Sequence, residues 1–120
     1  MKPETMMIDD QLYVRADSVE KPAQVDGMDY VIVRTYSAGV HAGYLASREG
    51  KEVKLLNSRR LYFWKGAATL SQLSVDGVSK PKECKFPCEV AEIELTEAIE
   101  VIKATEKARK SIARVTVWTA

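Results

Sequence analysis

Arginines and aromatic residues are interleaved in two short segments of this sequence. Arg34 is followed by Tyr36, and Arg59–Arg60 are followed by Tyr62 and Trp64. Arginine suits phosphate because its planar fork meets two oxygens at once, and it also stacks on rings. An aromatic ring that stacks on a nucleobase contributes about 1–3 kcal/mol. The two segments therefore predict a site for a small anionic ligand that carries a flat base.

A turn after the first segment adds backbone donors to this site. Ser37 and Gly39 lie in the expected turn, where N–H groups can face an anion. Tyr62 and Trp64 stand two residues apart on one face of an expected strand, so a core role and a site role both stay open for them. An arginine amid strand residues needs a partner, so the arginines are the stronger candidates.

The sequence offers no convincing catalytic group. His41 is the only histidine and has no nucleophile beside it, so a structural role on a strand is expected. The glutamates at positions 92, 94, 97 and 100 have the spacing of a solvated face rather than of an acid–base pair. The glycine-rich phosphate loops and the H-E-x-x-H motif are missing as well. We therefore expect a binding protein and not an enzyme.

The cysteines do not predict a metal site. Cys84 and Cys88 are the only two, and with one distant histidine they fall short of the four ligands of a structural zinc site. We expect two reduced thiols in a loop, no metal and no cofactor.

Charge is distributed in alternating blocks although the net charge is only +1. Residues 30–66 and 103–120 are basic, whereas residues 1–29 and 67–102 are acidic. The blocks could pack against one another, or the two basic blocks could converge on a small anionic ligand. The near-neutral sum argues against long nucleic acid as a partner.

Length and composition favour one α+β domain. The chain has 120 residues, of which 46% are hydrophobic, and no apolar stretch approaches the roughly 18 residues of a membrane span. Asp9 and Asp10 stand where a signal peptide would be apolar. We expect a soluble intracellular protein with no membrane partner. Residues 1–29 are expected to form an acidic arm or an edge strand, and residues 30–120 a single domain.

The domain should begin with an antiparallel meander and continue with two short helices toward the carboxyl end. Apolar alternation and turn residues predict strands at 30–36, 41–46, 52–56 and 60–64. Thr69 and Gln72 form a capping box for a short helix that Gly77 can close. Residues 92–104 fit a helix or strands, and two short strands split near Thr96 are favoured. Thr105 should cap the second helix, before an extended tail anchored by Trp118.

Three stretches resemble a small family of phage-encoded proteins. They are residues 30–40, residues 59–73, and Cys84–Cys88 with the Glu-rich strands that follow. They are similar to the Thoeris anti-defence sponge family, in the branch that captures cyclic ADP-ribose signals. The likeness covers residues 30–118.

The resemblance implies an antiparallel sheet followed by two helices, without enzymatic activity. It implies homo-oligomers, dimeric or hexameric, that hold glycocyclic ADP-ribose intact between protomers, so that bacterial anti-phage signalling is blocked. Cyclic trinucleotides would be further ligands at separate sites. The protein would act in the cytoplasm of the infected or lysogenic bacterial host.

The resemblance also assigns roles by motif position. It implies that Arg34, Arg60 and Arg109 contact phosphates and that Phe86 stacks on adenine. Arg114 lies about one helical turn beyond Arg109 and is the alternative to it. Apart from this resemblance, two functions stay open: a small phage protein that inhibits a host protein by docking onto it, and a binder of single-stranded nucleic acid.

Overall fold

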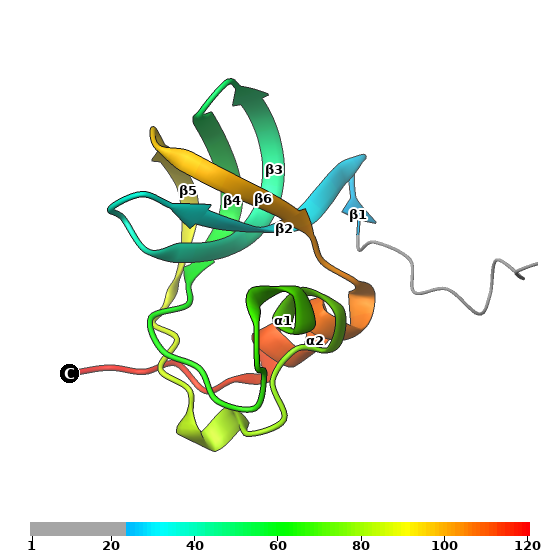
Figure 1. Ribbon diagram of the computed structural model, residues 1–120, viewed down its shortest axis with the longest axis vertical. Coiled ribbons are helices and arrows are strands. Elements are labelled where there is room, and N and C mark those ends of the chain that lie inside the picture. Colours follow the sequence, from blue (N-terminus) through cyan, green and yellow to red (C-terminus); the bar gives the residue numbers. More distant parts are fainter. Residues whose placement is uncertain (1–23) are drawn as a thin grey trace, which may run out of the picture.

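The strand β2, Met28–Thr35, lies at the centre of an antiparallel sheet in the computed structural model, which describes residues 24–120 (Figure 1). β3 pairs with one of its edges, and β1 and β6 pair with the other. The strands are β1 Gln24–Val25, β3 Val40–Glu49, β4 Glu52–Arg60, β5 Glu89–Leu95 and β6 Ala98–Lys103. The helices are α1 Leu70–Asp76, the short 3-10 turn η2 Pro81–Glu83 and α2 Glu106–Arg114. The predicted α+β fold class is confirmed.

The sheet curls until its two edges approach each other. β2, β3, β4 and β5 form a meander, and β6 then returns to pair with β2. Only Thr96 and Glu97 separate β5 from β6, and the Ala98 N–H donates to the Lys51 carbonyl at 3.0 Å. In Figure 1, β6 accordingly crosses in front of β4 and β5. The two short strands predicted around Thr96 are confirmed.

Each face of β2 belongs to a different core, which explains its unbroken apolar run. Val31 and Val33 pack inside the curl with Leu55. Tyr30 and Ile32 point the other way, into a core that the helices cover. A strand buried on both faces has no polar positions to alternate with.

The helices begin and end where the capping residues predict. Thr69 Oγ1 accepts the Gln72 N–H at 3.1 Å, and the Gln72 side chain reaches back to the Ala68 N–H at 2.7 Å. Thr105 Oγ1 accepts the Ala108 N–H at 3.0 Å at the start of α2. The two helices pack together below the sheet (Figure 1). Within residues 24–120, no helix is long and apolar enough to cross a membrane.

The strand predicted at residues 60–64 is wrong. β4 runs without a break from Glu52 to Arg60, and the chain leaves the sheet at Leu61. Asn57, which lies between the strands predicted at 52–56 and 60–64, takes a φ of 49° at a bulge inside β4. Within residues 61–64, Phe63 forms an isolated bridge to Lys85. α1 therefore lies between β4 and β5 rather than after a finished sheet.

The structure describes only the last part of residues 1–29, for which an arm or an edge strand was predicted. β1 and the first residues of β2 come from positions 24–29, which the sequence assigned to an acidic arm or an edge strand. The rest of that arm, residues 1–23, lies outside the described residues.

Candidate functional site

The turn that joins β2 to β3 is tightly held by its own side chains. The Thr35 N–H and Oγ1–H both donate to the Gly39 carbonyl, at 3.0 and 2.7 Å, and Thr35 Oγ1 accepts the Ala38 N–H at 2.8 Å. Gly39 takes a φ of +85°, a conformation that favours glycine. These hydrogen bonds fix the conformation of the turn and thereby the positions of the predicted site residues around it.

Arg60 and His41 converge on one backbone oxygen of this turn. Arg60 Nη1 donates to the Ala38 carbonyl at 2.7 Å, and His41 Nε2 donates to the same oxygen at 2.9 Å. His41 is 1% exposed, whereas Arg60 is exposed. Burial lowers the pKa of His41, so the imidazole is neutral at pH 7. The single histidine therefore stabilises the turn, and the Arg60 guanidinium stays accessible to a ligand.

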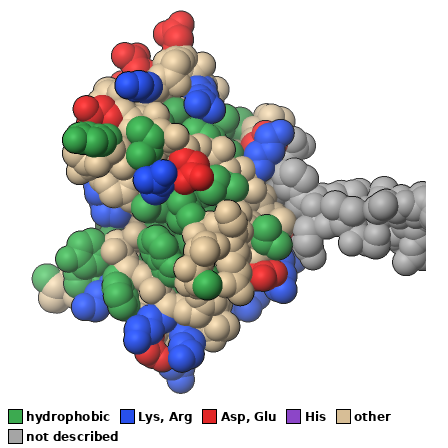
Figure 2. Space-filling view, viewed as in Figure 1, with side chains coloured by type: hydrophobic (Ala, Val, Ile, Leu, Met, Phe, Trp, Pro, Cys, Tyr) green, Lys and Arg blue, Asp and Glu red, His purple; other side chains and the backbone are tan. Residues whose placement is uncertain are grey.

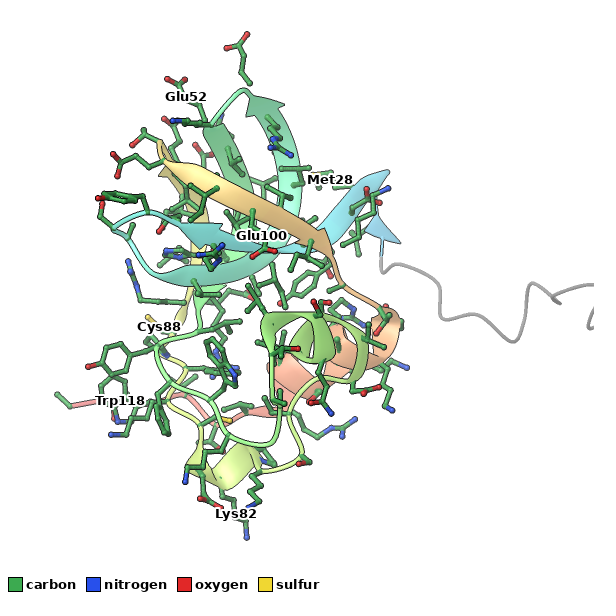
Figure 3. The ribbon with its side chains drawn as sticks, in the orientation of Figure 1. Met28, Glu52, Lys82, Cys88, Glu100 and Trp118 are labelled. Atoms are coloured by element: carbon green, nitrogen blue, oxygen red, sulfur yellow. The ribbon has the colours of Figure 1, made fainter. Side chains whose placement is uncertain are left out.

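The other predicted residues of this turn interact with β6 and the residues before it. Arg34 Nε donates to Glu100 at 2.9 Å on the solvent-exposed surface, where Figure 3 labels Glu100. Ser37 Oγ donates to Glu97 at 2.8 Å, and Tyr36 is 79% exposed. The register pairs Arg34 with Val40 but Arg60 with His41, so the two arginines lie at the same end of the sheet on opposite faces.

Arg59 is a structural residue in the core. The residue is 6% exposed, and its guanidinium donates to four backbone carbonyls at 2.7–3.0 Å: Phe86, Pro87, Ile112 and Val115. Burial lowers its pKa, but a guanidinium remains charged at neutral pH. Four of its five N–H groups are used by these carbonyls, so no pair of donors is left for a bidentate contact with phosphate, and the placement does not support Arg59 as a ligand contact.

Phe86 also lies in the core, contrary to the stacking role that the resemblance implied. It is 0% exposed and packs among the residues between the sheet and the helices. The Arg59 guanidinium lies 5.5 Å from the centre of its ring. A stacking ring needs an open face, and Phe86 has none in this structure.

An open ring face is found instead where three distant segments meet. Tyr62 and Trp118 stack with their ring centres 5.2 Å apart and their planes 8° from parallel. Lys85 Nζ lies 5.6 Å from the Trp118 ring and 5.8 Å from the Phe63 ring. Tyr62 is 63% exposed and Trp118 is 43% exposed. We call these four residues, Tyr62, Phe63, Lys85 and Trp118, the aromatic platform.

Backbone hydrogen bonds hold the aromatic platform together. Phe63 and Lys85 exchange both N–H···O bonds, at 3.2 and 2.7 Å, and the Trp118 N–H donates to the Phe86 carbonyl at 2.9 Å. Figure 3 shows Trp118 at the edge of the molecule, and Figure 2 shows hydrophobic and basic side chains together in that region. Trp64 is half-buried against the core. The sequence left a core role and a site role open for Tyr62 and Trp64. In the structure Tyr62 lies at the surface, whereas Trp64 packs against the core.

The two arginines of α2 line different hollows. Arg109 donates twice to Glu106, which raises the pKa of Arg109 and lowers the pKa of Glu106. Arg109 lines a cavity of about 230 Å³ between the sheet and α2. Arg114 is exposed and lines a groove of about 740 Å³ between α1 and α2. The structure therefore separates these arginines from each other.

Three residues of interest were missed by the site prediction. Trp118 was predicted to be an anchor for the tail, and neither Phe63 nor Lys85 was singled out. Lys85 lies in the cysteine loop, next to buried Cys84 and three residues before exposed Cys88, both of which are free thiols. Nothing local in the sequence connects these residues, because Trp118 meets Tyr62 only through the tertiary fold.

A family model described as "Domain of unknown function (DUF6948)" matches residues 28–112 of the chain. No curated protein and no solved structure matches the chain. The match spans β2 through most of α2 and includes Arg60 and three of the four aromatic platform residues, while Trp118 lies beyond it.

Proposed function

We propose that this chain, which belongs to the DUF6948 family, captures a cyclic ADP-ribose-type nucleotide without cleaving it. Glycocyclic ADP-ribose is the first candidate ligand, and cyclic trinucleotides are further ones. Capture would keep the nucleotide away from a bacterial anti-phage effector. The observation that carries the proposal is the exposed aromatic platform with Lys85 over its indole and Arg60 two residues from Tyr62.

The aromatic platform has the chemistry that a nucleotide needs. A stacked Tyr–Trp pair at the surface leaves flat ring faces in contact with water, and a nucleobase can cover such a face. Lys85 supplies positive charge at the rings, and the exposed Arg60, two residues before Tyr62 in the sequence, is a second cation available for the phosphates of a stacked nucleotide. Base and phosphate recognition can therefore be combined on one surface.

The burial of His41, the only histidine of the sequence, is compatible with a protein that binds its ligand without catalysing a reaction. His41 is buried, and its Nε2–H is used by the Ala38 carbonyl, so this imidazole is not presented to a ligand at the surface. The protein would hold its ligand by stacking and charge alone.

An oligomer belongs to this proposal. Arg34, Arg109 and Arg114 face different parts of the surface of one protomer. Only a dimer or a larger assembly, such as a hexamer, could bring several of these cations to the same ligand. A pocket between protomers is a natural site for a chain of this size.

The test is calorimetric titration of the full chain with cyclic ADP-ribose isomers. Lys85→Ala should weaken binding at least tenfold, because it removes the ammonium over the Trp118 ring. Lys82→Ala is the matched control, since Lys82 is exposed on η2 and away from Trp118 (Figure 3), and it should bind as the wild type does. Equal affinity of the two variants, or no binding by the wild type, would refute the proposal.

Docking onto a host protein is the second candidate, because exposed Tyr and Trp side chains are also enriched in protein interfaces. This function predicts a stable complex with a host protein and no change of thermal midpoint with any cyclic nucleotide. The titration above separates the two functions.

A further inference from the structure

The cavity between the sheet and α2 is lined by a tyrosine hydroxyl that the proposed function does not use. Tyr30 on β2 is only 6% exposed as a residue, and no described residue forms a hydrogen bond with its hydroxyl. Among the described side chains only Ser58 has a buried polar atom without a partner, so the Tyr30 hydroxyl is in contact with water in the cavity. The charged and phenolic groups that act on this hydroxyl are Tyr44, Glu89, Arg109 and Arg59, and all of them line the cavity. The Tyr30 hydroxyl therefore faces the cavity.

We propose that this cavity is a binding site for a small, uncharged nitrogen heterocycle that carries an amino group. The Tyr30 hydroxyl is held at the cavity by a buried ring, and a ligand that accepts a hydrogen bond from it would replace the water that the hydroxyl contacts there. Burial raises the pKa of Tyr30, so the hydroxyl keeps its proton and acts as the donor.

The polar groups around Tyr30 select an amino group next to a ring nitrogen. Glu89 lines the cavity from the start of β5, and its exposed carboxylate can accept an N–H from a ligand. The ring nitrogen of the ligand would accept the Tyr30 O–H. A carboxylate beside a hydroxyl donor is thus complementary to the donor–acceptor edge of an aminated heterocycle.

The charges around the cavity balance one another. Arg109 is paired with Glu106 and also interacts with the Tyr44 hydroxyl. Arg59 donates to four backbone carbonyls and keeps its positive charge, which interacts with the carboxylate of Glu89. Two cations and two carboxylates leave no net charge at the cavity, which favours an uncharged ligand.

Size and shape point to one flat ring. The volume of about 230 Å³ is below the roughly 300 Å³ at which pockets begin to hold drug-sized ligands. Ile112 and Val115 from the region of α2 add apolar surface to the lining that Tyr30 and Tyr44 provide. A sugar ring would leave these flat apolar surfaces poorly covered. The inference concerns a different surface from the aromatic platform, and Arg109 is the one cavity residue that the proposed nucleotide capture also considers.

The experiment is an NMR titration of the full chain with 2-aminopyrimidine, which is uncharged at pH 7. We expect saturable shifts at Tyr30, Tyr44 and Ala113 at millimolar ligand, and at least tenfold weaker binding of pyrimidine, benzene and D-ribose. Tyr30→Phe should weaken 2-aminopyrimidine binding at least tenfold without lowering the thermal midpoint, because the lost hydroxyl has no protein partner. Tyr36→Phe is the matched control and should change neither quantity, since Tyr36 is 79% exposed at the β2–β3 turn.

A second variant keeps the test decisive. Glu89→Gln changes an exposed residue and should weaken binding while the fold is retained. The proposal is overturned if 2-aminopyrimidine gives no saturable shifts, if benzene or ribose binds equally well, or if Tyr30→Phe binds as the wild type does. A lower thermal midpoint of Tyr30→Phe would also overturn it, because the hydroxyl would then have a structural partner.

Discussion

Arg59 connects more of this fold than any other side chain described above. Its four acceptors lie in the loop before β5, in the last turn of α2 and at the start of the carboxyl-terminal tail. Carbonyls at a helix end carry partial negative charge, so a buried guanidinium is favourable there. The same contacts position Lys85 and Trp118, which lie one and three residues from Arg59 acceptors.

Replacing Arg59 by lysine should therefore destabilise the fold by about 2–4 kcal/mol, because one ammonium cannot reach four carbonyls in a fork geometry. Urea denaturation measures this change. Arg60→Lys, on the exposed neighbour, should stay within about 0.5 kcal/mol of the wild type. Similar losses in both variants would mean that the network of Arg59 contributes little.

The lowered pKa of buried His41 should make the folded protein less stable in mild acid. Because burial lowers its pKa, the unfolded chain binds a proton more readily than the folded chain does. The contribution of neutral His41 to the free energy of unfolding is therefore complete above about pH 6.5, the pKa of histidine in the unfolded chain. This contribution is lost as the pH falls toward the lower pKa that His41 has in the folded protein. The thermal midpoint should fall between pH 7 and pH 5.5.

His41→Gln is the control for this pH effect, since an amide N–H can still donate to the Ala38 carbonyl but does not titrate in that range. The variant should lose most of the pH dependence. Because His41 is the only histidine, a variant that keeps the full dependence would show that another group is responsible.

The helices and strands that could be predicted are those encoded by sequence patterns within a few residues. The apolar run at Tyr30–Thr35 and the caps Thr69 and Thr105 each act within a few residues, and the structure has the elements they predict. Asn57–Ser58 resembled a turn because Asn tolerates positive φ, but pairing with β3 and β5 carries β4 through it as a bulge.

The candidate site was harder to predict than the elements. Arg60 and Tyr62 could be singled out because cations and rings alternate nearby in sequence. The role of Phe86 could not be judged, since burial depends on what packs over a residue. Trp118 joins Tyr62 from the far end of the chain, and no local pattern encodes that contact.

The junction of α1 with α2 gives a prediction for these elements. Gly77 ends α1 with a φ of +76°, and a Cβ there would overlap with the Cβ and Oγ of Ser111 on α2. Gly77→Ala should cost about 2–4 kcal/mol, from backbone strain and from the overlap with α2.

Gly50→Ala is the matched control for Gly77, because Gly50 also has a positive φ of +61° but nothing within 4 Å of its added Cβ. It should cost only about 1 kcal/mol, which is the strain alone. Denaturation midpoints of the two variants separate strain from overlap, and equal midpoints would contradict the close packing of α1 on α2.

On the scale of the whole molecule, the carboxyl-terminal tail separates two surfaces. Val117 lines the cavity between the sheet and α2, whereas Trp118 forms part of the aromatic platform. The tail runs beneath the sheet to the edge of the molecule (Figure 1). Under the two proposals, neighbouring residues of this extended segment would contact different ligands: Val117 the heterocycle in the cavity, and Trp118 the nucleotide on the aromatic platform.

Trp118→Ala should separate ligand capture from stability. The indole is 43% exposed, so its loss should cost about 1 kcal/mol or less in urea, while removal of the stacking face should weaken nucleotide binding at least tenfold. Unchanged affinity in this variant would exclude the aromatic platform as the capture surface.

The central claim is tested most directly by recovering the nucleotide after capture. The full chain is incubated with glycocyclic ADP-ribose, filtered to remove free ligand and heated, and the released nucleotide is identified by mass spectrometry. We predict retention of the nucleotide on the protein and recovery of the intact cyclic compound. A linear product such as ADP-ribose, or passage of all ligand through the filter, would contradict the account.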